Sequence, residues 1–206
     1  MDEWDVFLSP YRQAVEELKI KLKGIRKDYQ INRMSSPIEF VTARVKPVQS
    51  IIEKASKNNI SYDNLREGMY DIAGVRIMCQ FVDDIEIIRD QIKKRKDMRI
   101  VEERDYITNT KESGYRSYHI IIEYPVEDID GQVKILAEIQ VRTLAMNFWA
   151  TIEHTLNYKY SGEYPEEIKE RLQTAAEAAN KLDQEMSLIR EEVQEAQKLF
   201  SKKRNL

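Results

Sequence analysis

The sequence of 206 residues is poor in the features that would mark it as secreted or membrane-bound. It has one cysteine, Cys79, which excludes an internal disulfide, and the surrounding run GVRIMCQF predicts that this thiol is buried. Its acidic start, MDEWDVF, has no hydrophobic segment of the kind that a secretory signal needs. No uncharged apolar run is long enough for a membrane helix. We therefore expect a cytoplasmic protein without a membrane partner.

Neither sign of charge dominates the chain. Lys and Arg together number 33 and Asp and Glu 36, which gives a formal net charge of −3. This balance gives no global reason to expect a nucleic-acid or membrane partner, so any anion site must come from local clustering. The chain also has no Walker-type glycine loop and no GxGxxG, HExxH or CxxC motif. Protease, zinc-enzyme and dehydrogenase functions therefore have no support in the sequence.

The order of apolar patterns predicts one α+β domain with helical arms at both ends. Helices are expected from Ser9-Pro10 to about residue 30, and from the capping-box pattern Ser36-Pro37-Ile38-Glu39 to about residue 56. Two more are expected over 83–96 and 143–159. Strands are expected over 74–81, 99–107, 117–124 and 133–143. The catalytic-size core would span about 36–160, with arms over 1–30 and 165–204.

The last segment has the most regular pattern in the chain. Its apolar residues step by four and three throughout, which is the spacing of a heptad seam. Such a seam needs a partner, which the N-terminal helix or another subunit could supply. Its members are Ile168, Leu172, Ala175, Ala179, Leu182, Met186, Ile189, Val193, Ala196 and Phe200.

The stretch Lys134–Thr143, KILAEIQVRT, alternates strictly between apolar and mostly polar residues, as a strand with one buried face does. Its second face carries Glu138, Gln140 and Arg142. This face is either an ordinary solvated side of an antiparallel sheet or the floor of a polar site. Alternation alone leaves both interpretations open.

Two carboxylates lie beside apolar strand sequence, where an acid is costly unless it is paired, solvated or metal-bound. Asp71 precedes IAGVRIMC, and Glu138 lies within AEIQV. Carboxylates of this kind are suited to hold Mg²⁺ in a reaction on nucleotides. The structural alternative for each is a salt bridge, for instance to Arg76 or Arg142.

Cationic residues gather in two further segments. TARVKPVQSI contains Arg44, Lys46 and Ser50, and the expected helix would place residues 46 and 50 on one face. The loop KESGYRSYH combines a glycine with Lys111, Tyr115 and His119, so that an aromatic ring could lie on a base with cations near phosphates. A plain turn before a strand explains the same loop, and His119 alone could be structural.

Five motifs taken together resemble a known family. TARVKPVQSI, DIAGVRIMC, RDYITNTKESGYRSYH, AEIQVRT and NFWATIEH follow one another between about residues 36 and 160. This order resembles the synthetase domain of RelA/SpoT-type proteins, and the short length is similar to the stand-alone small alarmone synthetases of the RelQ type. The resemblance implies a nucleotidyltransferase-like mixed β-sheet flanked by helices.

The activity that the resemblance implies is transfer of pyrophosphate from ATP to the 3′-hydroxyl of GDP or GTP. The products would be AMP and (p)ppGpp, the alarmone of the stringent response. The resemblance also implies a homotetramer, to which the heptad seam gives an independent reason. Long relatives carry a hydrolase domain with a His-Asp pair, which is lacking here, so we expect synthesis without degradation.

The resemblance assigns roles residue by residue. Glu138 and Asp71 would be catalytic and hold Mg²⁺, with Glu138 accepting the proton of the attacking hydroxyl. ATP would be bound by Arg44, Lys46, Ser50 and Arg76. GDP or GTP would be bound by Arg104, Lys111, Tyr115, His119, Gln140 and Asn147. A possible allosteric site for the alarmone would comprise Lys19, Lys23, Arg26, Phe40 and Thr42.

Two other function classes compete with this hypothesis. The basic run Lys93–Lys96, KKRK, could contact RNA in a binding protein, although the overall charge does not favour it. A different nucleotidyltransferase could form a phosphodiester, but such enzymes gather neighbouring carboxylates, whereas Asp71 and Glu138 are far apart in sequence. The segment before Tyr106 reads EERD and leaves the choice between GDP and GTP open.

Overall fold

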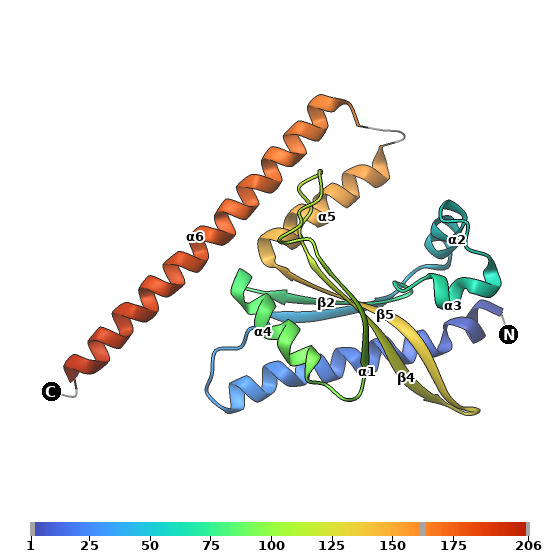
Figure 1. Ribbon diagram of the computed structural model, residues 1–206, viewed down its shortest axis with the longest axis horizontal. Coiled ribbons are helices and arrows are strands. Elements are labelled where there is room, and N and C mark those ends of the chain that lie inside the picture. The colour runs from blue at the N-terminus through green and yellow to red at the C-terminus, as the bar shows by residue number, and fades with distance from the viewer. Residues whose placement is uncertain (1–2, 161–163, 205–206) are drawn as a thin grey trace.

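A five-stranded mixed sheet forms the centre of the molecule in the computed structural model, which describes residues 3–160 and 164–204 (Figure 1). Its strand order is β1-β2-β5-β4-β3. Strands β2 and β5 are parallel, and the other neighbours are antiparallel. The strands are β1 Phe40–Val45, β2 Ala73–Cys79, β3 Arg99–Asp105, β4 Tyr118–Asp128 and β5 Gly131–Thr143.

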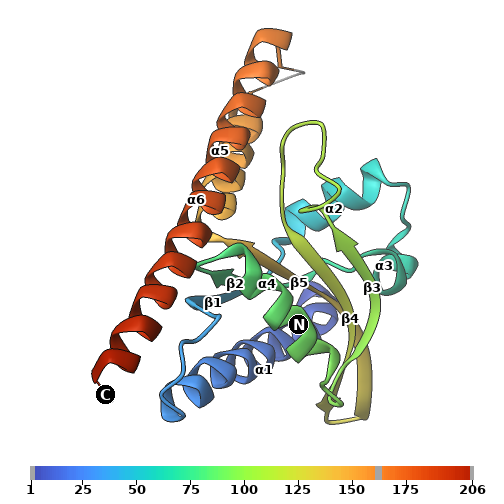
Figure 2. The same cartoon turned by 60° about the vertical axis from the view of Figure 1, so that its left-hand side comes forward.

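Helices cover one face of this sheet and extend beyond its end (Figures 1 and 2). Helices α1 (Glu3–Ile31) and α4 (Val82–Lys93) pack on the apolar face, in the same core as the strands. The smaller helices are α2 (Val48–Lys57), the 3₁₀ turn η1 (Tyr62–Asn64) and α3 (Leu65–Gly68). Helices α5 (Leu144–Lys159) and α6 (Glu166–Arg204) lie side by side. Among the described residues, no helix combines the length and apolar character of a membrane span.

The alternation predicted for β5 is confirmed by its burial. Ile135, Ala137, Ile139 and Val141 are all buried in the main core. Burying one branched aliphatic side chain contributes about 1.5–3 kcal/mol, so this face fixes the register of the strand. The polar residues of β5 must then lie on the opposite face. The prediction of an α+β domain with a mixed sheet is likewise confirmed.

The predicted helix over 36–56 is wrong in its first half, where the chain forms strand β1. Ser36 does not cap a helix, because its hydroxyl accepts a bond from the Ile38 N–H and closes a local turn. The following FVTARV alternates, with Val41 buried, and pairs with the open edge of β2. Helix α2 begins only at Val48. Lys46 and Ser50 therefore do not share a helix face.

The first helix begins earlier than Ser9-Pro10 predicts. Helix α1 starts at Glu3, and Pro10 lies inside it. The apolar face continues upstream through Phe7 and Leu8, which are both buried, and the ring of Trp4 packs edge-on against Phe7. This burial outweighs the one helix hydrogen bond that proline cannot donate.

Helix α6 contacts the rest of the chain mainly with a face other than its heptad seam, although the seam residue Leu172 packs against the buried Trp149 and Ala150. Ala176, Asp183 and Arg190, spaced by seven, face the body, and Arg190 pairs with Asp83 and Asp84 of α4. The seam residues from Leu182 to Val193 are 41–55% exposed. Helix α1 therefore does not cover the seam within the chain.

The junction between β5, α5 and α6 depends on one threonine. Thr143 caps α5 by accepting a bond from the Met146 N–H, and its hydroxyl donates to the buried carboxylate of Asp183 at 2.6 Å. Burial raises the pKa of Asp183, and the bond from Thr143 counteracts the rise. The hydroxyl thus supports both helices at the point where they leave the sheet.

We expect Thr143→Val to lower the free energy of unfolding by about 1–3 kcal/mol, because it removes the cap and leaves a buried acceptor unpaired. Thr143→Ser keeps both bonds and is the matched control. Denaturant unfolding followed by tryptophan fluorescence measures the difference. Equal stability of the two variants would contradict this role.

Candidate active site

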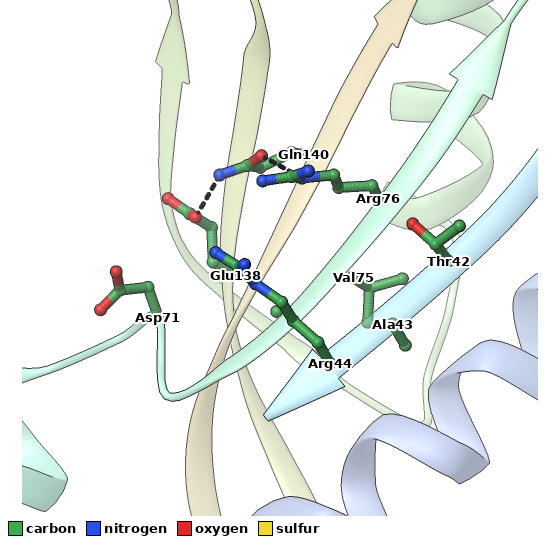
Figure 3. A pocket seen from close by; sticks show the side chains of 9 residues that line it. Thr42, Ala43, Arg44, Asp71, Val75, Arg76, Glu138 and Gln140 are labelled. Carbon is green, nitrogen blue, oxygen red and sulfur yellow. Dashed lines mark hydrogen bonds between the residues drawn. The ribbon is translucent and has the colours of Figure 1, made fainter. Parts of the chain in front are cut away.

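An open cleft of about 570 Å³ lies on the polar face of the sheet, where β1, β2 and β5 run side by side (Figure 3). Arg44 and Arg76 extend over its floor, with Glu138 and Gln140 opposite them and Asp71 at one side. Its lining is Thr42, Ala43, Arg44, Asp71, Gly74, Val75, Arg76, Glu138 and Gln140. Two residues of the polar face of β5, Glu138 and Gln140, therefore line a cleft, while its use as a site stays a prediction.

Strand register brings the predicted site residues together in one row across the whole sheet. Residues directly opposite each other on paired strands share a face. One row contains a polar residue from each strand: Thr42, Arg76, Gln140, His119 and Arg104, in spatial order. This row joins residues of the ATP and acceptor sets that lie far apart in the sequence.

The neighbouring row leaves room for a ligand. It aligns Arg44 with Gly74 and Gly74 with Glu138. A Cβ atom added to Gly74 would lie 3.8 Å from the Arg44 carbonyl oxygen, with nothing nearer. The glycine thus keeps open the space between the guanidinium of β1 and the carboxylate of β5.

Asp71 is held by two lysines at the edge of the cleft. The ammonium groups of Lys46 and Lys54 both lie 2.7 Å from the same carboxylate oxygen, Oδ2. Burial alone would raise the pKa of Asp71, but these two cations outweigh it and lower the pKa. The other oxygen, Oδ1, is buried without a hydrogen-bond partner among the described residues. An ionised carboxylate with a free oxygen is a suitable ligand for a hard cation.

Lys54 was missed by the sequence interpretation. It lies on α2 one turn after Ser50, and i,i+4 spacing puts both residues on the same helix face. Ser50 is not in the lining of the cleft but lies on the side of α2 that carries Lys54 toward Asp71. Once α2 is known to start at Val48, this spacing would have found Lys54.

Glu138 is a buried carboxylate with both oxygens engaged. Nδ1 of His119 lies 2.9 Å from Oε1, and the Gln140 amide donates to Oε2 at 2.6 Å. Burial would raise the pKa of Glu138, but the bonds from His119 and Gln140 outweigh it and lower the pKa. A carboxylate only accepts, so Nδ1 of His119 is the donor. Glu138 is therefore ionised and firmly oriented.

Arg142 is not a salt-bridge partner of either acid. Arg142 as a whole is 4% exposed, and its guanidinium donates to Ser117 Oγ, to the hydroxyl of Tyr115 and to Gln140 Oε1. Tyr115 in turn lies 2.8 Å from Nε2 of His119. A chain of hydrogen bonds thus runs from Arg142 through Tyr115 and His119 to Glu138.

The cations of the cleft are crowded. Burial, Arg142 and Arg44 all lower the pKa of Arg76, whose Nε donates to Gln140. Among the described residues, no carboxylate lies within salt-bridge distance of Arg44, Arg76 or Arg142. The three guanidinium groups therefore repel one another. This repulsion falls when an anion or a polarisable nucleobase lies between them.

An aromatic cluster lies beside Glu138. The rings of Tyr106, Tyr115 and His119 pack edge-on with centroids 5.1–6.0 Å apart. The ammonium of Lys111 lies 4.6 Å from the Tyr106 ring centroid and 5.2 Å from that of Tyr115. The structure therefore brings Lys111, Tyr115 and His119 together, with Tyr106 as a further member that the motif did not single out.

Arg104 lies at the far end of the polar row. It makes two bonds to Glu102, one to the Tyr70 hydroxyl, and its guanidinium lies 4.4 Å from the Tyr70 ring centroid. Lys54 lies over the same ring at 5.3 Å. Tyr70, which precedes Asp71, thus contacts both cations.

Two polar groups of α5, Asn147 and Glu153, are not among the residues that line the cleft. The Oδ1 atom of Asn147 is buried without a hydrogen-bond partner in the described part of the chain. Burial raises the pKa of Glu153, against the attraction of His154 and Lys111. Glu153 was not a predicted site residue, since its helix position gives no signal without the fold.

The five residues predicted for an allosteric site come from two faces of the sheet edge. Phe40 and Thr42 point to the cleft face of β1, and Thr42 lines the cleft itself. Lys19, Lys23 and Arg26 lie on α1, which packs against the opposite face. Arg26 reaches the Glu39 carbonyl beside β1. Whether the five bind one effector stays a prediction.

Comparison with known proteins now adds to this geometry. A family model described as "Region found in RelA / SpoT proteins" matches residues 43–163. The chain is 62% identical over 202 residues to the GTP pyrophosphokinase YjbM of Bacillus subtilis, covering 98% of this chain and 95% of that protein. The match thus extends over nearly the full length of both.

Two solved structures of B. subtilis small alarmone synthetase 1 are similar to this chain. The complex with its product pppGpp has a TM-score of 0.90 at 61% identity and covers 93% of this chain and 98% of that one. The complex with AMPCPP has a TM-score of 0.83 at 57% identity, with 94% and 98% covered.

Proposed function

The chain belongs to the RelA/SpoT family, and from this premise we infer that it is a small alarmone synthetase, a GTP/GDP diphosphokinase. It transfers pyrophosphate from ATP to the 3′-hydroxyl of GDP or GTP and releases AMP. A relative named GTP pyrophosphokinase at 62% identity supports this function, as does the structure of a relative with pppGpp.

The observation that carries the proposal is the polar row with Glu138 beside it. Arg76 and Gln140 lie between the residues assigned to ATP on β1 and those assigned to the acceptor on β4. Two nucleotides bound from the two sides would therefore meet above Glu138. Transfer between them depends mainly on positioning and charge neutralisation, which this arrangement supplies.

Each substrate has its own part of the row in the proposed mechanism. The planar guanidinium groups of Arg44 and Arg76 stack on the adenine of ATP, and Lys46 meets its phosphates. Tyr115 stacks on guanine, and Lys111 binds the acceptor phosphates. Glu138 takes the proton of the 3′-hydroxyl as its oxygen attacks the β-phosphorus. The bond between the α,β-bridging oxygen and the β-phosphorus breaks. AMP leaves with this oxygen and the negative charge that develops on it.

Asp71 and Glu138 are the residues that would hold Mg²⁺. The described residues contain no group of three or more acidic, histidine or cysteine ligands. This fits Mg²⁺, which is commonly held by one or two carboxylates together with substrate phosphates. The unpartnered Oδ1 of Asp71 provides the free ligand atom. When bound, the metal would neutralise charge on the transferred phosphates.

Three further properties complete the proposal. The exposed seam of α6 packs against other subunits of a homotetramer, since such an apolar stripe is stable in water only when covered. The alarmone acts as an effector through Lys19, Lys23, Arg26, Phe40 and Thr42. The enzyme works in the cytoplasm, where its nucleotide substrates are.

The function is tested by incubating the protein with Mg²⁺, ATP labelled in the γ-phosphate, and GDP or GTP. We expect the label in (p)ppGpp and one AMP per product. Release of pyrophosphate would instead indicate a phosphodiester-forming enzyme, and release of phosphate alone would indicate hydrolysis. Either result, without alarmone, would overturn the proposal.

We expect Lys54→Met to raise the KM for ATP by about tenfold or more and to leave the KM of the acceptor nearly unchanged. The residue lies with Lys46 on Asp71, where an ammonium can turn to ATP phosphates and make charge-assisted bonds. Steady-state kinetics with each substrate varied separately measures this. Lys57→Met, on the exposed end of α2, is the control. Equal KM changes for both substrates would contradict the assignment.

A further inference from the structure

The loop that carries Lys111 and Tyr115 comes closest to α6 at one glycine. Gly114 has φ +84°, a conformation that side chains rarely adopt. A Cβ atom placed on it would lie 2.4 Å from the Cβ of Ala176, and the Gln173 Cα is 3.7 Å away. The backbone of the loop therefore lies directly on the surface of α6, at a point where both residues must be small.

This contact is part of a small core that is separate from the main one. Trp149, Ala150 and Ala176 are buried together, with the ring of Tyr115 and Leu172 packed against them. The Trp149 indole donates to the Leu172 carbonyl at 2.9 Å and so ties α5 to α6. A satellite cluster under a loop holds that loop in place. Here the cluster holds Tyr115, the residue that we propose stacks on the guanine.

Tyr115 is fixed from the other side by polar contacts. Its hydroxyl accepts from Arg142 at 2.5 Å and lies 2.8 Å from His119, which bonds to Glu138. The ring and the hydroxyl are thus held by different elements, α5 and α6 on one side and the sheet on the other. A shift of the loop on α6 must move Tyr115 relative to Glu138.

We propose that Ala176 of α6 is a positioning residue for the acceptor nucleotide, because its contact with Gly114 sets the place of Tyr115. The inference rests on the proposed function of the cleft. It extends the acceptor site to α6, a helix outside the sheet. The ATP side of the cleft, on β1 and β2, has no part in this contact.

The test compares Ala176→Leu with Ala178→Leu, a matched change at an exposed position of the same helix. A larger side chain at 176 displaces the loop, so the KM for GDP or GTP should rise about tenfold or more. The KM for ATP should change less than about twofold, since α6 is remote from β1. The variant at 178 should behave as the wild type.

A double-mutant cycle isolates the contact itself. Gly114→Ala introduces both the 2.4 Å clash and an unfavourable φ, whereas Ala176→Gly removes the opposing Cβ. We expect the pair Gly114→Ala/Ala176→Gly to bind the acceptor about fivefold or more tighter than Gly114→Ala alone. No recovery in the pair would overturn the proposal. So would a rise of both KM values together in Ala176→Leu.

The outcome can be separated from failure of the proposed function. Acceptor affinity is measured directly by titrating GDP or GTP against the tryptophan fluorescence of the full chain, without turnover. Weaker acceptor binding in Ala176→Leu would support the positioning role even if no alarmone formed. Unchanged binding in an active enzyme would remove the positioning role and leave the synthetase function intact.

Discussion

Replacing Glu138 with Gln is expected to slow alarmone synthesis by about 10²- to 10⁴-fold, the usual contribution of a general base. The amide has the same shape, so it can keep a hydrogen bond with His119 after a tautomer change, but it cannot take a proton from the 3′-hydroxyl. The loss should lie in kcat, because Glu138 is placed to act on the reacting atoms and not to bind the adenine or the guanine. Single-turnover rates at saturating substrates measure it.

The control for this variant is Glu123→Gln on β4. Glu123 pairs with Arg99 and Lys134 at the surface, where ion pairs contribute little, so its replacement should leave the rate unchanged. Full activity of Glu138→Gln would refute the assigned base. A loss confined to KM would instead assign Glu138 to binding.

The same variant gives a test of stability against pH. The pKa of Glu138 is lower in the folded protein than its ordinary value of 4.5. Burial disfavours the ionised form, but the hydrogen bonds from His119 and Gln140 stabilise that form by more. Ionised Glu138 thus stabilises the fold above about pH 4.5, and this contribution is lost as the pH falls below that value. Thermal unfolding at pH 5 and pH 3.5 should show a smaller loss in Glu138→Gln than in the wild type.

How much of the site the sequence could predict is clearest on β5. Period-two alternation placed Glu138, Gln140 and Arg142 on one face, because the side-chain direction in a strand is a local property. Alternation could not say that β5 lies between β2 and β4, since strand order depends on contacts far apart in the chain. The row through Arg76 and His119 therefore became visible only with the register.

The wrong first half of the predicted helix over 36–56 has the same physical origin. Ser36-Pro37-Ile38-Glu39 has the local chemistry of a helix start, yet the hydroxyl of Ser36 closes a turn within two residues. What decides the conformation of residues 40–45 is pairing with the edge of β2, which no local pattern contains. Lys54 was hidden for this reason, because its role depends on where α2 begins.

The heptad seam shows the opposite case, a real pattern whose residues from Leu182 to Val193 stay exposed within the chain. The spacing correctly predicted a long helix, since α6 runs from Glu166 to Arg204. It could not predict that α6 would contact the body through Ala176 and Asp183 instead. An apolar stripe left exposed while another face packs is the physical reason for proposing that other subunits cover it.

Replacing Asp71 with Asn is expected to lower the rate by about 10²- to 10⁴-fold, since charge neutralisation by a bound metal contributes several kcal/mol to transfer. The neutral amide is a weaker ligand, so the Mg²⁺ concentration for half-maximal rate should rise. Asn also leaves the ammonium groups of Lys46 and Lys54 without their shared carboxylate. Rates measured across a Mg²⁺ series, with Asp63→Asn as a surface control, test this.

The Mg²⁺ series also separates the two carboxylates. A deficit in metal affinity is reduced by mass action, so high Mg²⁺ should recover part of the rate in Asp71→Asn. A missing base cannot be replaced in this way, and Glu138→Gln should stay slow at every Mg²⁺ concentration. If Asp71→Asn showed an unchanged Mg²⁺ requirement, the carboxylate would act only as the anchor of Lys46 and Lys54. If high Mg²⁺ restored Glu138→Gln instead, Glu138 would be a metal ligand first, and another group would have to accept the proton.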